Sequence, residues 1–193
     1  SQFIECPIIN AGDGYHEHPT QALLDLYTIR EAKGSLKGLN VIIVGDIAHS
    51  RVVRSNIYAM KTMGMNIKLI GPPTMIPVEI KNMGVCVDYY LEDAVRDADV
   101  IMMLRLQTER QNKFLLSSLR EYSNLFCLTS KILKKAKKDV LIFHPGPVNR
   151  GIEISLDVME SNRSLILNQV TNGVAVRMAL MYLLLGGNND SIN

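Results

Sequence analysis

Five short apolar runs alternate with segments that favour helices, and this alternation constrains the fold more than any other feature of the sequence. The runs are rich in β-branched residues and cover residues 39–44, 66–70, 85–90, 100–104 and 140–143. Strands that alternate with helices build a parallel sheet covered on both faces, with right-handed crossovers. We therefore predict an α/β fold, a doubly wound and mostly parallel five-stranded sheet with helices on both faces.

The helical segments and a polar linker divide the chain further. The first predicted helix begins at Pro19, and Leu23, Leu26 and Tyr27 share one of its faces, which predicts an amphipathic helix. The linker 33–38 contains two glycines and marks a domain boundary. Further helices are predicted over residues 50–63, 77–83, 91–97, 108–122, 129–136, 155–159 and 172–185, and a loose tail is predicted from 186 to 193.

Composition and charge exclude several classes of function. The 193 residues are enough for one large domain, or for one domain with pieces of another. A formal net charge of +2 gives no basic field for nucleic acid or a membrane surface, and no apolar run or signal segment predicts a membrane protein. Cys6, Cys86 and Cys127 are too widely spaced for a metal-binding motif, and we expect no metal and no cofactor. Two of the three lie in apolar runs, so we expect buried thiols in a reducing cytoplasmic compartment.

A polar segment over residues 10–21 enters the first helix and carries the first candidate site. His18 and Gln21 are three residues apart, so they lie on the same side of the first turn. Orphan backbone N–H groups in that turn favour an anionic ligand. An imidazole beside a carboxamide can hold a carbonyl oxygen and its amide. The alternative is a helix cap with polar side chains that face solvent.

The ends of the predicted strands carry the second candidate site, because ligands of open α/β sheets bind beyond the carboxyl ends of the strands. Arg51 follows the first strand at a helix start, and Arg105 and Gln107 follow the fourth strand. Guanidinium groups bind carboxylates through two parallel hydrogen bonds, so two arginines suit a dicarboxylate. Arg51 alone is also compatible with an exposed helix face. Arg105 ends an apolar run, where a surface charge has no structural need.

Two further segments follow strands. Asp46 follows Gly45 as an acid does in nucleotide-binding folds, but the glycine-rich fingerprint is missing, so a Rossmann-type nucleotide binder is the weaker alternative. After the fifth strand, Pro145 and Pro147 flank Gly146. Prolines lack a backbone N–H, so this segment offers bare carbonyl oxygens that can accept hydrogen bonds from an NH₂ group. A simple stiff turn is the alternative.

Four segments together resemble the catalytic chain of the aspartate carbamoyltransferase family, and they occur in the family's order. They are Gly12-Asp13-Gly14 with His18-Pro19-Thr20-Gln21, Gly45-Asp46 with Ser50-Arg51-Val52, the segment 104–110, and the segment 144–151. The resemblance covers nearly the whole chain. It implies that the α-amino group of L-aspartate attacks the carbonyl carbon of carbamoyl phosphate. The products would be N-carbamoyl-L-aspartate and phosphate, in pyrimidine biosynthesis.

The resemblance also implies roles for residues on the carbamoyl side of the reaction. His18 and Gln21 hold the carbamoyl group, and His18 polarises its oxygen as negative charge builds in the tetrahedral intermediate. The backbone carbonyls of Gly146 and Pro147 accept hydrogen bonds from the carbamoyl NH₂. No metal takes part, so positioning and charge stabilisation would supply much of the rate.

On the aspartate side, the resemblance implies that Arg51 and Arg105 clamp the carboxylates of the substrate and that Gln107 assists them. The family forms homotrimers with sites between subunits, and its trimers associate with regulatory or dihydroorotase partner chains. We expect the same kinds of partner here, and neither nucleic acid nor membrane.

By the same resemblance, the chain matches the C-terminal two-thirds of the family's catalytic chain. Residues 1–33 would end the carbamoyl-phosphate domain, 34–168 would form the aspartate-binding domain, and 169–193 would return as a C-terminal helix and tail. The family's Ser-Thr-Arg-Thr phosphate motif and the loop lysine that reaches a neighbouring subunit are absent from the sequence. We therefore expect the chain to be the later part of a longer polypeptide and to be inactive alone.

Two rival functions belong to the same fold. Ornithine carbamoyltransferases carry His-Cys-Leu-Pro where this chain has His-Pro-Gly-Pro at 144–147. They also carry an Asp…Ser-Met-Gly segment where this chain has Leu-Arg-Leu-Gln at 104–107, which suits a second carboxylate. The other rival is a non-catalytic transcarbamoylase-like module kept for assembly with a partner. The presence of His18, Arg51 and Arg105 argues against that module.

Overall fold

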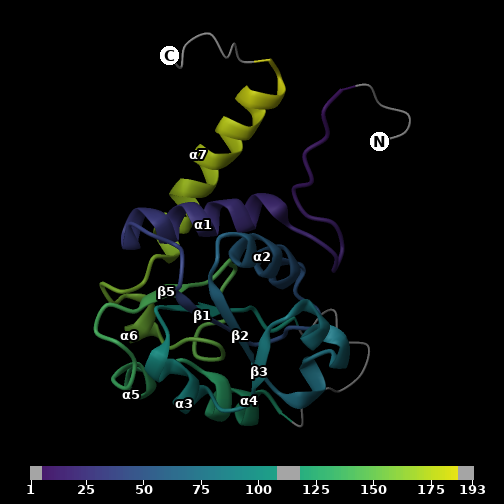
Figure 1. The fold of residues 1–193 in the computed structure, drawn as a ribbon. Helices are drawn as coiled ribbons and strands as arrows, with labels where there is room; N and C mark the ends of the chain where they lie inside the picture. The colour runs from purple at the N-terminus through teal and green to yellow at the C-terminus, as the bar shows by residue number, and fades with distance from the viewer. Residues whose placement is uncertain (1–5, 108–117, 187–193) are drawn as a thin grey trace.

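A computed structural model describes residues 6–107 and 118–186, and a parallel sheet forms its centre (Figure 1). Within these residues the sheet has the strands β1 (Asn40–Val44), β2 (Asn66–Ile70), β3 (Cys86–Asp88), β4 (Val100–Met103) and β5 (Leu141–Phe143). The strand order is β3-β2-β1-β4-β5, and every adjacent pair is parallel. All five strands lie within the predicted apolar runs, so the predicted sheet is confirmed.

Helices cover both faces of the sheet because successive strand residues point to opposite sides. In β1, Val41 and Ile43 belong to one apolar core, and Ile42 and Val44 belong to the other. The first core is closed by α1 (Pro19–Lys33) and α2 (Arg51–Thr62). The second core is closed by α3 (Leu91–Ala94), α4 (Leu119–Phe126), α5 (Ser130–Leu133) and α6 (Leu156–Met159). The predicted doubly wound architecture is therefore confirmed.

The remaining elements are short 3₁₀ turns and one long helix. The turns are η1 (Pro73–Met75), η2 (Val78–Met83) and η3 (Val95–Asp97). The long helix α7 (Ile166–Leu184) packs against α1 and then projects beyond the body of the molecule (Figure 1). Within the described parts of the chain, no helix is both long enough and apolar enough to cross a membrane.

Several predicted boundaries are wrong. The helix predicted to start at 172 starts at 166, because no glycine or proline interrupts residues 166–171. The helix predicted over 129–136 covers only α5, because backbone bonds from residue i to i−3 tighten its end. Residues 108–117 lie outside the described part, and α4 begins after Ser118, whose hydroxyl accepts from the Glu121 N–H. Only Cys127 of the three cysteines is buried, so the expectation of buried thiols is wrong for Cys86, which lies in the apolar run 85–90.

The apolar residues that were predicted to share one face of α1 do so, because Leu23, Leu26 and Tyr27 all line one groove. Leu23 and Tyr27 are nevertheless exposed, at 42% and 38%. The buried face instead carries Gln21, Asp25 and Thr28 among small and apolar residues. A helix can bury polar side chains when each finds a hydrogen-bond partner, and a rule that looks for apolar stripes misses this solution.

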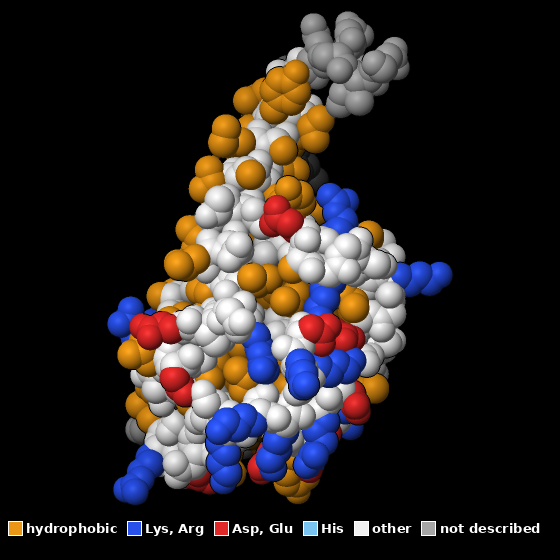
Figure 2. Space-filling model, turned by 90° about the vertical axis from the view of Figure 1, so that its left-hand side faces the viewer, with side chains coloured by type: hydrophobic (Ala, Val, Ile, Leu, Met, Phe, Trp, Pro, Cys, Tyr) orange, Lys and Arg blue, Asp and Glu red, His pale blue; other side chains and the backbone are white. Residues whose placement is uncertain are grey.

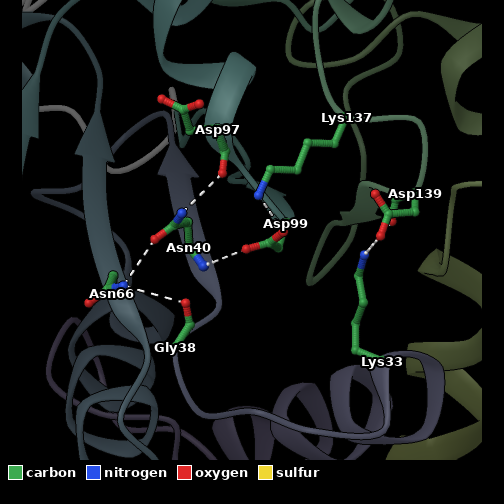
Figure 3. A network of polar contacts seen from close by, with 8 residues as sticks. All are labelled: Lys33, Gly38, Asn40, Asn66, Asp97, Asp99, Lys137 and Asp139. Atoms are coloured by element: carbon green, nitrogen blue, oxygen red, sulfur yellow. Dashed lines mark hydrogen bonds and ion pairs between the residues drawn. The ribbon is translucent and has the colours of Figure 1, made fainter.

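Figure 3 shows a polar network at the amino ends of the strands. The backbone N–H of Asn40, which begins β1, donates to Asp99 Oδ2 across 2.8 Å. Lys137 donates to the other carboxylate oxygen of Asp99 at 2.6 Å, and Lys33 at the end of α1 donates to Asp139 Oδ2 at 2.7 Å. These contacts hold the end of α1 beside the segments that enter β4 and β5. They leave the opposite edge of the sheet, at the carboxyl ends, for the candidate site.

The first prediction concerns two strand ends at that opposite edge. A Cβ at Gly71, which follows β2, would lie 2.5 Å from the backbone oxygen of Gly45, which follows β1. Because both atoms belong to backbone, the strands would have to separate, and we expect Gly71→Ala to lower the free energy of unfolding by about 3 kcal/mol. Urea unfolding measures this. The control Gly34→Ala meets open space and carries only a left-handed backbone cost of about 1 kcal/mol; equal losses in the two variants would contradict the prediction.

Candidate functional site

The sheet order places three segments at one edge. Because β1, β4 and β5 are neighbours and parallel, the residues that follow them emerge side by side. Gly45 follows β1, Arg105 and Gln107 follow β4 closely, and His144 follows β5 directly. The candidate site is built on this edge, from the loop before α1, the first turn of α2 and the segments after β4 and β5.

The loop before α1 brings His18 to α2. Asp13 and Glu17 form an antiparallel bridge, so the loop turns back on itself before the helix begins. The backbone N–H of His18 then donates to Ser55 Oγ of α2 across 2.8 Å. The Ser55 hydroxyl in turn donates to the carboxylate of Glu17. The start of α1 is therefore fixed on the first turns of α2.

Arg51 lies beside the same loop. It is the first residue of α2, one turn before Ser55. A Cβ added to Gly12 would lie 2.6 Å from the Arg51 guanidinium carbon, so the loop backbone at Gly12 lies against this side chain. The structure thus brings Arg51 and His18 together.

His18 is neutral at physiological pH. Partial burial lowers the pKa of His18 to about 4, and the positive charges of Arg51 and Arg177 lower it in the same direction. The Thr20 hydroxyl lies 3.5 Å from His18 Nδ1, at the limit of a hydrogen bond. A neutral imidazole can donate one hydrogen bond to a developing oxyanion. This is the chemistry that a carbonyl-polarising residue needs.

Gln21 is held by a buried carboxylate on the same helix. Gln21 Nε2 donates to Asp25 Oδ1 across 3.0 Å, and Gln169 Nε2 of α7 donates to the same oxygen at 2.8 Å. Asn56 Nδ2 of α2 donates to Asp25 Oδ2 at 2.9 Å. Asp25 is fully buried, and burial raises its pKa to about 6, although the hydrogen bonds from the three amides oppose the rise.

The segment after β5 is linked to this carboxylate. Gln169 Oε1 accepts a hydrogen bond from the backbone N–H of His144 at 2.9 Å, while its nitrogen is bound to Asp25. The N–H of Gly146 donates to His144 Nδ1 at 2.9 Å. The peptide bond between Gly146 and Pro147 is cis, and both residues are exposed. Hydrogen bonds therefore connect Gln21 to the proline segment through Asp25 and Gln169.

The segment after β4 is held by a second buried carboxylate, Glu153. Its Oε1 accepts from the Leu106 N–H at 2.8 Å, and its Oε2 accepts from the Asn149 N–H at 2.8 Å. Leu106 lies between Arg105 and Gln107, so this contact fixes both at the site edge. Gln107 Oε1 is buried and has no hydrogen-bond partner among the described residues, which leaves an acceptor for a ligand.

Sequence reasoning named the residues at the strand ends but missed those that orient them. Asp25 and Glu153 are acids inside apolar runs, with leucines on both sides of Asp25 and isoleucines on both sides of Glu153. That pattern is a usable signal, because a charge is buried only when it is paired. Asn56 and Gln169 carry no such local signal. That His18, Gln21, Arg51, Arg105, Gln107, Gly146 and Pro147 bind substrates stays a prediction.

The family described as aspartate/ornithine carbamoyltransferase, Asp/Orn binding domain, matches residues 37–184. The chain belongs to the aspartate/ornithine carbamoyltransferase family. Residues 1–31 match the carbamoyl-P binding domain of that family. The gap between the two matches falls at the predicted linker, while the predicted domain bounds of 1–33, 34–168 and 169–193 stay predictions.

Named relatives agree with the family. The aspartate carbamoyltransferase catalytic subunit of Syntrophus aciditrophicus is 63% identical over 182 residues, which are 94% of this chain and 59% of the relative. The catalytic subunit of Natranaerobius thermophilus is 58% identical over 188 residues, 97% of this chain and 60% of the relative. The chain therefore spans about 60% of the length of these curated relatives.

Solved structures give the same fold. Aspartate transcarbamoylase from Trypanosoma cruzi, in complex with N-(phosphonacetyl)-L-aspartic acid, matches with a TM-score of 0.78 and 30% identity over 91% of this chain and 58% of that chain. Ornithine carbamoyltransferase from Pyrococcus furiosus matches with a TM-score of 0.76 and 30% identity over 90% of this chain and 58% of that chain. Since both enzymes fit about equally well, the fold alone does not distinguish the two substrates.

The second prediction concerns pH. Because the pKa of Asp25 is raised from 3.8 to about 6, the folded state binds more protons than the unfolded state in this range, and its stability falls as pH rises from 4 to 6. His18 acts in the opposite direction, since its pKa is lowered from 6.5 to about 4. Asp25→Asn removes only the first contribution. Relative to the unsubstituted chain, we expect this variant to gain about 3 kcal/mol between pH 4 and 6.5.

Urea unfolding at several pH values measures this difference. The control is Thr28→Val, which alters the same buried face of α1 without removing an ionisable group and should give an offset that does not depend on pH. A difference between Asp25→Asn and the unsubstituted chain that stays constant from pH 4 to 6.5 would contradict the assignment.

Proposed function

We propose that this chain forms the aspartate-binding domain, and part of the carbamoyl-phosphate site, of an aspartate carbamoyltransferase. The reaction transfers the carbamoyl group of carbamoyl phosphate to the amino group of L-aspartate and gives N-carbamoyl-L-aspartate and phosphate, in de novo pyrimidine (UMP) synthesis. The observation that carries the proposal is the pairing of neutral His18 with Arg51 at an edge where Arg105 follows the adjacent strand. Relatives at 58–63% identity are named as catalytic subunits of that enzyme.

The proposed mechanism uses each group for a task that its chemistry allows. The neutral imidazole of His18 donates to the carbamoyl oxygen as negative charge develops there in the tetrahedral intermediate. Gln21 and the carbonyls of Gly146 and Pro147 hold the carbamoyl NH₂. The amino group of aspartate attacks the carbonyl carbon, the C–O bond to phosphate then breaks, and the departing phosphate takes the proton that the attacking amine loses. Fixed donors and acceptors act here without reorganisation, which is the main source of rate in such sites.

Arg105 and Gln107 favour aspartate over ornithine. Aspartate carries a second carboxylate, which a guanidinium binds through two hydrogen bonds. Ornithine reacts through its side-chain amino group, so its α-ammonium group would face Arg105, which would repel it. Gln107 adds a buried amide oxygen that can accept a hydrogen bond from the amino group of a bound amino acid.

Exposed apolar helix faces support the proposal that a further domain completes the site. Figure 2 shows apolar side chains along the projecting helix α7. They include Leu167, Val170, Val174, Met178 and Tyr182. An apolar groove lies between α1 and α7 and is lined by Leu23, Tyr27, Val176 and Leu180, among others. Surfaces of this kind usually bind protein, and the relatives are longer than this chain.

We therefore propose that the remaining part of the carbamoyl-phosphate domain covers these faces and that the chain alone is inactive. The assembled enzyme would be a cytoplasmic homotrimer with sites between subunits, open to a regulatory or dihydroorotase partner chain. The family resemblance carries these last proposals.

The third prediction tests activity directly. The 193-residue chain alone should make no carbamoyl aspartate in a colour assay with carbamoyl phosphate and aspartate. A fusion that places the uncovered part of the Syntrophus relative ahead of Ser1 should make it, because the missing phosphate-binding groups are then supplied. In this fusion His18→Ala should lower kcat by about a hundredfold or more. His16→Ala, at an exposed histidine, is the control and should have no effect; sustained turnover by the chain alone would refute the proposal that it is incomplete.

The fourth prediction concerns the amino-acid substrate. In the fusion, Arg105→Ala should raise KM for aspartate by about ten- to a hundredfold, because one charged pair of hydrogen bonds is lost. Arg54→Ala, at an exposed arginine of α2, is the matched control and should leave KM unchanged. The assay is repeated with ornithine. Formation of carbamoyl ornithine in place of carbamoyl aspartate would identify the rival enzyme.

A further inference from the structure

The ionised carboxylate of Asp25 can only accept hydrogen bonds, and this determines the orientation of the side-chain amides around it. An ionised carboxylate has four lone-pair positions and no donor. The amides of Gln21, Asn56 and Gln169 all face it, from α1, α2 and α7. Each must therefore present its NH₂ group to Asp25 and point its oxygen elsewhere. With a pKa of about 6, Asp25 is ionised at pH 7 and above, so this requirement holds there.

For two of these amides, the structure shows what surrounds the side-chain oxygen. Gln169 Oε1 accepts from the backbone N–H of His144, which begins the proline segment. Asn56 Oδ1 is buried and has no hydrogen-bond partner among the described residues. The NH₂ group of Asn56 donates to Asp25 Oδ2 at 2.9 Å and to the Met102 sulfur at 3.5 Å, so contacts of its nitrogen set the orientation of this amide. The same constraint acts on Gln21, whose oxygen is left on the side away from Asp25.

We propose that Asp25 is a positioning residue for carbamoyl phosphate: it fixes Gln21 as a hydrogen-bond acceptor for the carbamoyl NH₂ and holds the proline segment in place through Gln169. The inference rests on the proposed function and adds to it. Asp25 acts through its neighbours and does not touch the substrate. Its effect is on the recognition of an NH₂ group.

The inference makes Asp25 a determinant of specificity. Acetyl phosphate has a methyl group where carbamoyl phosphate has its NH₂. A site with fixed acceptors forms hydrogen bonds with the NH₂ group, but its acceptors stay unsatisfied when a methyl group takes that place. Such a site therefore discriminates strongly between carbamoyl phosphate and acetyl phosphate. Without Asp25 the amide of Gln21 can turn, and the acceptor is no longer fixed. Binding of carbamoyl phosphate should then weaken more than binding of acetyl phosphate.

The fifth prediction tests this in the fusion at pH 8, where Asp25 is ionised. Asp25→Ala should raise KM for carbamoyl phosphate about tenfold, while the inhibition constant of acetyl phosphate and KM for aspartate change less than threefold. Asp25→Asn should keep most of the discrimination, because its oxygen can serve Gln21 and Gln169 while Asn56 turns its unsatisfied oxygen toward the new NH₂. Thr171→Val, at an exposed residue of α7 whose hydroxyl donates to the Leu167 carbonyl of the same helix, does not touch this network and should leave the ratio unchanged.

Gln169→Met keeps the test valid if Asp25→Ala does not fold. It retains the carboxylate and frees the proline segment, so KM for carbamoyl phosphate should again rise about tenfold relative to the acetyl phosphate constant. Equal weakening of both ligands, or an unchanged ratio in a folded and active variant, overturns the inference and leaves the proposed function standing. An unsubstituted fusion that makes no carbamoyl aspartate overturns both.

Discussion

The arrangement of this molecule depends on one buried charge. Asp25 is fully enclosed, and an ionised carboxylate without partners would cost several kcal/mol in such a place. The three amides that offset this cost come from three helices, so α1, α2 and α7 must all be present in one geometry. The same helices carry or support His18, Arg51 and His144. The requirement to satisfy one carboxylate therefore constrains how these three helices pack behind the site.

Glu153 imposes a similar constraint on the other half of the site. It joins the segment after β4 to the segment after β5, through the N–H groups of Leu106 and Asn149. His144 lies between the two carboxylates: its backbone is bound to Gln169, and its Nε2 lies 3.8 Å from Glu153 Oε2. A shift of the segment after β5 would thus disturb both acids. The segment after β5 therefore links the two buried acids.

The sequence predicted the elements that depend on neighbouring residues. It did not predict the contacts between residues that lie far apart in the chain. Each strand follows from a local run of β-branched residues, and all five were found where those runs occur. The pairing of Gln169 with Asp25 joins residues 144 positions apart and leaves no periodic pattern. The orientation of α1 depends on that pairing, and the apolar pattern that places Leu23 and Tyr27 on one face does not show that this face stays exposed. Of the long-range contacts, only the acids inside apolar runs left a local trace.

Both α1 and α7 bury polar side chains and expose apolar ones, and this determines how the two helices contact each other. Among its described residues, α7 buries Gln169, Asn172 and Gly173 and exposes most of its apolar side chains. The contact between the two helices is therefore a polar seam, in which Asn172 donates to Thr28 Oγ1 at 3.0 Å. Hydrogen bonds are directional, whereas apolar contacts tolerate sliding and repacking. The seam thus fixes the angle between α1 and α7. It therefore also sets how any domain that binds the apolar sides of these two helices is oriented relative to Asp25.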